Sequence, residues 1–155
     1  MTDNTEVLSK LAHRTILYFK ENLSLDIEED FQIQEVKSID YLEVTTLISL
    51  TGDICGTIAM SLSSDLSYKM IESFIFEEIS KDKAKALIDE NVKETLNITL
   101  GNILSDLEVV KKGGTVGISI PYSLDDNVAL EKEEGFIYLC KLKLNDENIL
   151  LSYFI

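Results

Sequence analysis

The segment from Ala84 to Lys111 reads AKALIDENVKETLNITLGNILSDLEVVK and holds the longest uninterrupted helical pattern of the chain. It contains no proline and a single glycine, Gly101, and its apolar residues recur every three or four positions. This spacing predicts one long helix with an apolar face toward a core. The apolar face comprises Ile88, Val92, Leu96, Leu100, Ile103 and Leu107.

The opposite face of this helix is polar and has an unusual composition. Asn97 and Gly101 both lie in mid-helix, although both are poor helix formers and glycine costs up to about 1 kcal/mol relative to alanine. Two explanations are open: this face has a function, or Gly101 allows a neighbouring helix or strand to approach closely. The polar face comprises Glu90, Glu94, Asn97, Gly101, Ser105 and Glu108.

Length and charge limit the classes of function. A chain of 155 residues that is 45% apolar suits one compact domain, here residues 1–155, which buries roughly 70% of its unfolded surface. The formal net charge is −14, from 28 acidic and 14 basic residues. Such a chain is repelled by nucleic acid and by anionic membranes, so we expect neither as a partner. A docking site for a protein remains open.

The few cysteine and histidine residues limit metal and nucleophilic chemistry. Cys55 and Cys140 lie in separate apolar runs without metal-ligand spacing, so we expect two buried free thiols. His13 is the only histidine, which excludes a histidine metal cluster and a Ser–His or Cys–His pair. We expect the His13 ring to be partly exposed or satisfied by a neighbouring group, and no metal to be bound. Since the sequence shows neither a membrane-length apolar run nor a signal pattern, we expect a cytoplasmic protein.

The remaining segments predict an α+β fold, with an antiparallel sheet covered on one side by long helices. Two β-branched runs flank the turn signal Thr51-Gly52-Asp53, which is typical of a hairpin, and Gly56 indicates a bulge or a close backbone approach. A second helix is expected at 65–77, capped by Ser63 or Ser64, with Phe74 and Phe76 in the core. Further expected elements are a helix at 4–22, a strand from residue 31, a strand over 115–122 ending near Pro121, a turn at 123–127, and three strands over 128–155.

The sequence Glu94-Thr95-Leu96-Asn97, followed by Gly101-Asn102, resembles the active helix of the CheX/CheC family of chemotaxis phosphatases. The segment GTIAMSLSSDLSYKMIESF at 56–74 resembles the strand and second helix of that family, and Pro121 occupies the place of a family proline. The resemblance covers roughly residues 31–155 in motif and in element order. It implies a CheX-like fold.

This resemblance implies a specific activity and partner. Family members hydrolyse the aspartyl phosphate of CheY, a response-regulator receiver domain. By the resemblance, Asn97 positions the attacking water, Glu94 anchors the active-site lysine of the receiver, and Glu90, Gly101 and Asn102 contact the receiver. No cofactor is expected in this chain, and Mg²⁺ is expected in the receiver. The single copy of the motif is the CheX pattern, which also implies a homodimer.

Two other functions remain open. The family often has Asp or Ser four residues before the glutamate, whereas this chain has Glu90. This difference favours a non-catalytic CheX-like module that binds a phosphorylated receiver. The third possibility is a structural dimer in which the polar face packs against a partner helix.

Overall fold

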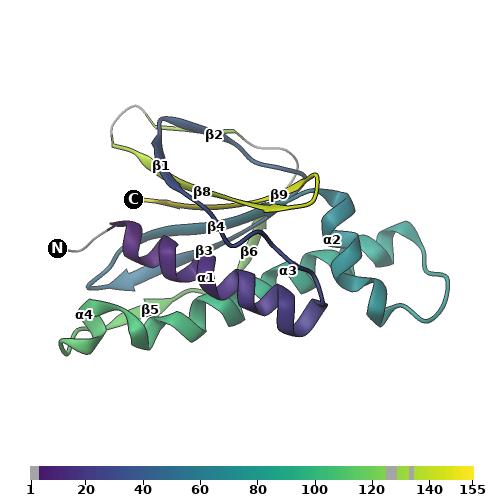
Figure 1. The fold of residues 1–155 in the computed structure, drawn as a ribbon, viewed down its shortest axis with the longest axis horizontal. Coiled ribbons are helices and arrows are strands. Elements are labelled where there is room, and N and C mark those ends of the chain that lie inside the picture. Colours follow the sequence, from purple (N-terminus) through teal and green to yellow (C-terminus); the bar gives the residue numbers. More distant parts are fainter. Residues whose placement is uncertain (1–3, 125–128, 133–134) are drawn as a thin grey trace.

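The computed structural model of the chain describes residues 4–124, 129–132 and 135–155. In it a layer of helices packs on an antiparallel sheet (Figure 1). The strand order is β1-β8-β9-β4-β3-β5, and β6 also pairs with β3. This architecture confirms the predicted α+β fold. The strands of this sheet are β1 (Ile33–Val36), β3 (Val44–Gly52), β4 (Gly56–Leu62), β5 (Val116–Ile118), β6 (Tyr122–Leu124), β8 (Ile137–Leu144) and β9 (Glu147–Phe154).

The hairpin of β3 and β4 forms where the glycine turn predicts it, with Val44 opposite Leu62 and Leu50 opposite Gly56. Gly56 has a φ of +146°, and a Cβ at this position would lie 2.5 Å from the ring of Tyr153. The predicted close backbone approach at Gly56 is therefore confirmed, and β9 is the strand that approaches.

The helical layer consists mainly of α1 (Asn4–Leu23) and α3 (Lys81–Ile103), which pack against each other and on the sheet. The shorter α2 (Ser64–Ile71) packs against α3, and its N-cap is Ser63, one of the two predicted caps. Apolar residues of α1 at helical spacing are buried against the sheet. They include Val7, Leu8, Leu11 and Phe19.

The long helix begins earlier and ends earlier than predicted. Ser80 caps its start, accepting a hydrogen bond from the Lys83 amide at 3.2 Å, and α3 ends at Ile103. A 3₁₀ turn, η2 (Leu104–Asp106), and a short helix, α4 (Glu108–Lys111), follow. The backbone is extended at Leu107, whose side chain remains buried. The single helix predicted through Lys111 is thus wrong, and Ser105 and Glu108 lie beyond α3.

The second predicted helix also ends early, and its two phenylalanines are not in the core. After α2 comes a 3₁₀ turn, η1 (Glu72–Phe74), and then an irregular connection to α3. Phe74 is 60% exposed and Phe76 is 93% exposed, so their predicted burial is wrong. The apolar pattern continues past Ile71, but the chain there becomes an irregular connection into α3, and Phe74 and Phe76 belong to neither apolar cluster.

A second, smaller sheet covers part of the opposite face of the main sheet. It pairs β2 (Ser38–Asp40) with β7 (Ala129–Glu131). Tyr41 follows β2, and its hydroxyl lies 2.9 Å from the hydroxyl of Ser152 in β9; burial raises the Tyr41 pKa. The turn predicted at 123–127 lies partly outside the described residues, and its first two residues belong to β6 instead. The second apolar cluster is Ile39, Tyr41, Leu47, Ala59, Ile137, Leu139 and Leu150.

The two cysteines are both free, but only one is buried. Cys140 lies in the core between sheet and helices, and burial raises the pKa of its thiol to about 12. Cys55 is exposed, contrary to the prediction, because it lies in the β3–β4 turn, where its thiol donates to the carbonyl of Gly52. His13 is exposed as expected and packs edge-on against Phe31.

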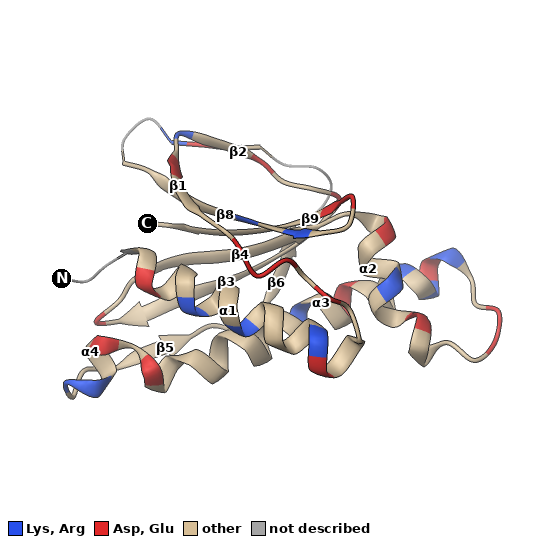
Figure 2. Cartoon of the chain, viewed as in Figure 1, with Lys and Arg blue, Asp and Glu red and all other residues tan. Residues whose placement is uncertain are grey.

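Acidic residues gather in two connections, one leading into β1 and one between α2 and α3 (Figure 2). Glu28, Glu29 and Asp30 are exposed in the first, and Glu77 and Glu78 are exposed in the second. These five acidic residues therefore lie in solvated segments rather than against the core. None of the helices that the structure describes is long and apolar enough to cross a membrane.

Candidate functional site

The polar face predicted on the long helix exists along α3. Glu90, Glu94, Asn97 and Gly101 are three or four residues apart, so at about 100° per residue they lie within roughly 60° of one another. Glu90, Glu94 and Gly101 are exposed, and Asn97 is half-buried. We call these four residues the α3 stripe.

Core packing determines which way the α3 stripe faces. Val92, Leu96 and Leu100 are at most 1% exposed, and all three belong to the main core. The hydroxyls of Thr95 and Thr99 are also buried, and each donates to the carbonyl four residues earlier, at 2.8 and 2.7 Å. Because the opposite side of α3 is anchored in this way, the stripe is presented outward on a rigid element.

Glu94 and Asn97 are free to meet a partner. Among the residues that the structure describes, neither side chain has a hydrogen bond or an ion pair with another group. They are one helical turn apart, about 4.5 Å along the axis. An exposed carboxylate and a half-buried amide therefore lie on the same face of the helix, one accepting hydrogen bonds and the other able both to donate and to accept.

Glu90 differs from Glu94 because it has a cation beside it. The Lys93 ammonium lies 3.1 Å from Oδ2 of Asp89 and 3.6 Å from Oε1 of Glu90. Its hydrogen bond with Asp89 is the largest cause that raises the pKa of Lys93. Lys93 is thus held toward Asp89 and Glu90, and it leaves the Glu94 carboxylate without an intramolecular cation.

Gly101 has open space in front of it. A Cβ built at this position would meet no atom within 4 Å other than the backbone of its own helix and its chain neighbours. Within the described chain, no helix or strand approaches Gly101. The explanation that Gly101 serves internal packing is therefore wrong, and a surface explanation for the glycine remains.

Asn102 does not lie on the α3 stripe. It is exposed, but as the neighbour of Gly101 it projects about 100° further around the helix. The structure therefore brings four of the five predicted residues onto one face and leaves Asn102 at its margin.

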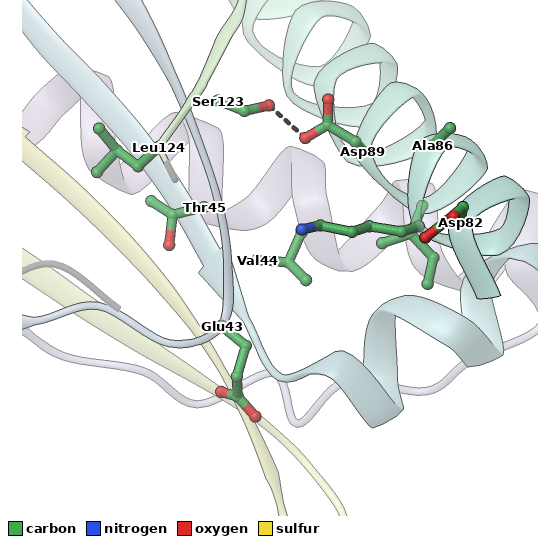
Figure 3. Close-up of a pocket in the computed structure, with 10 residues that line it drawn as sticks. Glu43, Val44, Thr45, Asp82, Ala86, Asp89, Ser123 and Leu124 are labelled. Atoms are coloured by element: carbon green, nitrogen blue, oxygen red, sulfur yellow. Dashed lines mark hydrogen bonds between the residues drawn. The ribbon is translucent and has the colours of Figure 1, made fainter. Parts of the chain in front are cut away.

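A cleft that the sequence did not predict lies on the flank of α3 (Figure 3). It has a volume of about 1030 Å³ and separates the N-terminal half of α3 from β3 and β6. At its wall the Ser123 hydroxyl donates a short hydrogen bond to the Asp89 carboxylate. The helical spacing of Asp82, Lys85 and Asp89 could have indicated one wall of this cleft. Ser123, on the other wall, comes from a strand and is 34 residues from Asp89.

The cleft and the α3 stripe are linked through charged side chains. Asp89 lines the cleft and pairs with Lys93, which in turn lies beside Glu90 of the stripe. Among the described residues, no group of three His, Cys, Asp or Glu side chains is placed to hold a metal ion.

Solved structures of several chemotaxis proteins share this fold. CheX from Desulfovibrio desulfuricans is 12% identical, with a TM-score of 0.72 over 96% of this chain and 98% of that one. CheX from Vibrio vulnificus is 15% identical, with a TM-score of 0.73 over 96% and 97%. A CheX–CheY complex with BeF₃ and Mg²⁺ from Borrelia burgdorferi matches at 18% identity and a TM-score of 0.73, over 99% and 97%. At these identities the likeness shows a shared fold.

Comparison at the level of sequence families gives a separate result. None of the curated proteins matches this chain. The family described as chemotaxis phosphatase CheX matches residues 44–139, which is more than half of the 155 residues and includes all of α3. The chain therefore belongs to the CheX family of chemotaxis phosphatases.

Proposed function

We propose that this protein hydrolyses the aspartyl phosphate of a CheY-like receiver domain, with Asn97 and Glu94 as its working residues. The observation that carries the proposal is the pair itself: an exposed carboxylate and a half-buried amide, both unpartnered among the described residues, one turn apart on a helix anchored in the core. The phosphatase activity of the family supports it. So does the Borrelia burgdorferi relative, whose fold is shared and which forms a complex with CheY, BeF₃ and Mg²⁺.

The chemistry of the reaction suits these side chains. An aspartyl phosphate is an activated acyl phosphate, and its hydrolysis needs a water molecule in line with the leaving carboxylate oxygen. The Asn97 amide can accept a hydrogen bond from that water and donate one to a phosphoryl oxygen. Because the amide carries no charge, it does not repel the phosphoryl group as a carboxylate at the same position would.

Glu94 and Gly101 would hold the receiver against Asn97. The Glu94 carboxylate, which has no internal cation, can pair with the active-site lysine of the receiver. The open space at Gly101 lets a loop of the receiver approach the helix backbone. Glu90 and Asn102 border this contact. Mg²⁺ would be supplied by the receiver, where it neutralises phosphoryl charge during the transfer.

The remaining features of the proposal rest on the composition of the chain and, for the homodimer, on the family resemblance. We expect residues 1–155 to act as one phosphatase domain, in the cytoplasm and as a homodimer. Sedimentation of the purified chain would measure the oligomeric state directly.

The experiment is a dephosphorylation assay with a phosphorylated receiver and Mg²⁺. Asn97→Ala should lower the accelerated rate by about 100-fold or more, because a water displaced by about 1 Å already costs on that order. The matched control is Asn148→Ala, at an exposed asparagine in β9, which is two strands from the β3 that α3 covers. Equal rates for the wild type and Asn97→Ala would remove the catalytic assignment.

A non-catalytic receiver-binding module is the second candidate, and Glu90 is the observation that favours it. Glu90 stands where the family often has Asp or Ser, and it is drawn toward Lys93 at 3.6 Å. A module of this kind would bind a phosphorylated receiver without changing its rate of dephosphorylation. Binding with no acceleration by the wild type would establish this alternative.

A further inference from the structure

Two leucines of the helical layer are exposed although the other large apolar residues of the same helices are buried or half-buried. Leu87 on α3 is 41% exposed and Leu17 on α1 is 38% exposed. Leu87 precedes Glu90 by three residues and Glu94 by seven, so it continues the α3 stripe toward the N-terminus of the helix.

Leu17 lies beside the α3 stripe on the neighbouring helix. The two helices run in opposite directions (Figure 1). Near the end of α3 the Lys10 ammonium donates to the carbonyl of Asp106, and the Glu6 carboxylate accepts from the Glu108 amide at 2.9 Å. Leu17 is seven residues further along α1, about 10 Å, which brings it near the level of Asn97. Because α1 and α3 cover the same face of the sheet, their exposed sides both point away from it.

The size of a protein interface decides whether a docked receiver reaches these leucines. A stable interface covers about 800 Å² on each partner, equivalent to a disc of roughly 16 Å radius. Leu87 is about 10 Å along the helix from Glu94, and packed helices lie about 8–10 Å apart. A receiver centred on Glu94 and Asn97 therefore covers both leucines.

We propose that Leu87 and Leu17 are the apolar docking contacts for the receiver domain, placed around the Glu94–Asn97 pair. This inference rests on the proposed function and adds the chemistry of the partner surface: apolar side chains flanking its phosphoaspartate pocket. Two leucines supply affinity without adding charge to a face that already carries Glu90 and Glu94. Because neither leucine approaches the reacting atoms, they stabilise the bound ground state and the transition state equally.

The test uses Leu87→Ser, Leu17→Ser and the double variant of the full chain. Phe136→Ser is the matched control, since Phe136 is 46% exposed and precedes β8, three strands from the β3 that α3 covers. Binding is measured with a panel of receiver domains carrying beryllofluoride and Mg²⁺, and turnover with the same receivers phosphorylated. Each single variant should raise Kd and KM about fivefold and the double variant about 25-fold, with kcat unchanged. Thermal unfolding checks that the variants are folded.

The outcomes separate this inference from the proposed function. Wild-type turnover with an unchanged KM in the double variant overturns the leucine contacts and leaves the phosphatase standing. Leucine-dependent binding without any acceleration supports the contacts and refutes the phosphatase. Failure of every receiver to bind the wild type overturns both. If the double variant instead converts a wild-type dimer to monomers in sedimentation, the leucines belong to self-association and the proposal is wrong.

Discussion

Gly101 lies one turn beyond Asn97, and its hydrogen atoms face open space rather than a neighbouring element. A glycine at this position does not stabilise the isolated chain, because glycine within a helix is less favourable than alanine. Gly101→Ala should therefore raise the free energy of unfolding by about 0.5–1 kcal/mol, measured by urea denaturation.

A side chain at position 101 should weaken receiver binding even where it stabilises the free protein. A long side chain, as in Gly101→Gln, also fits the open space of the free protein but would occupy the path of an approaching loop. Its expected result is unchanged or higher stability together with a raised KM for the phosphorylated receiver. An unchanged KM for Gly101→Gln would show that the receiver does not approach this turn of α3.

The placement of Glu94 and Asn97 on one face of the helix, away from the core, could be predicted from the sequence. Their spacing requires a shared face, and the core residues Val92, Leu96 and Leu100 decide which side of the helix is buried. The cleft beside α3 could not be predicted in this way. Its Asp89–Ser123 hydrogen bond joins residues 34 positions apart, and a period within one helix carries no information about such a contact.

At the scale of elements, local periodicity predicts where helices occur better than where they end. Leu107 continues the apolar spacing of α3 and is buried as that spacing predicts, but in an extended conformation that ends the helical run. The start of α4 depends on Glu6 of α1, whose carboxylate accepts from the Glu108 amide. Because this cap comes from a residue 102 positions earlier, the pattern around Leu107 gives no sign of it.

The cap of α2 joins a helix to a strand and should contribute more stability than the cap of α3. Ser63 accepts from the Leu66 amide at 3.1 Å and donates to Oε2 of Glu147 in β9 at 2.6 Å. Ser63→Ala removes both contacts and should lower the free energy of unfolding by about 1–2 kcal/mol. Ser80→Ala, which removes one exposed capping bond, is the matched control and should cost about 0.5–1 kcal/mol. Equal losses in chemical denaturation would mean that the Glu147 contact contributes nothing.

At the scale of the whole molecule, the main sheet has an apolar cluster on each face. The cluster beneath the helices was expected, because amphipathic helices and alternating strands both need a shared core. The second cluster forms partly under β2 and β7, which pair three residues each across about 90 positions of chain. Strands this short have too few residues for a period of two to stand out, so the smaller sheet could not be predicted.

Burial of Cys140 in the core should make the free energy of unfolding depend on pH. The thiol is buried in the cluster beneath the helices, and desolvation raises its pKa from 9.0 to about 12. The unfolded chain therefore releases this proton at a lower pH than the folded chain does. The stabilisation is complete below pH 9 and is lost as the pH rises from 9 toward 12.

The free energy of unfolding should therefore fall faster with rising pH in the wild type than in a variant without this thiol. Between about pH 8 and pH 10 the wild type should lose about 1.4 kcal/mol more than Cys140→Ala, since only the unfolded thiol ionises there. Tyr41 and Tyr153, whose pKa values burial also raises, are present in both proteins, so their contributions cancel in the comparison. Urea titrations across this range measure the difference, and Cys55→Ala, at the exposed cysteine of the β3–β4 turn, is the matched control. Parallel pH profiles for the wild type and Cys140→Ala would mean that the thiol ionises equally easily in the folded protein, which requires water to reach the core between helices and sheet.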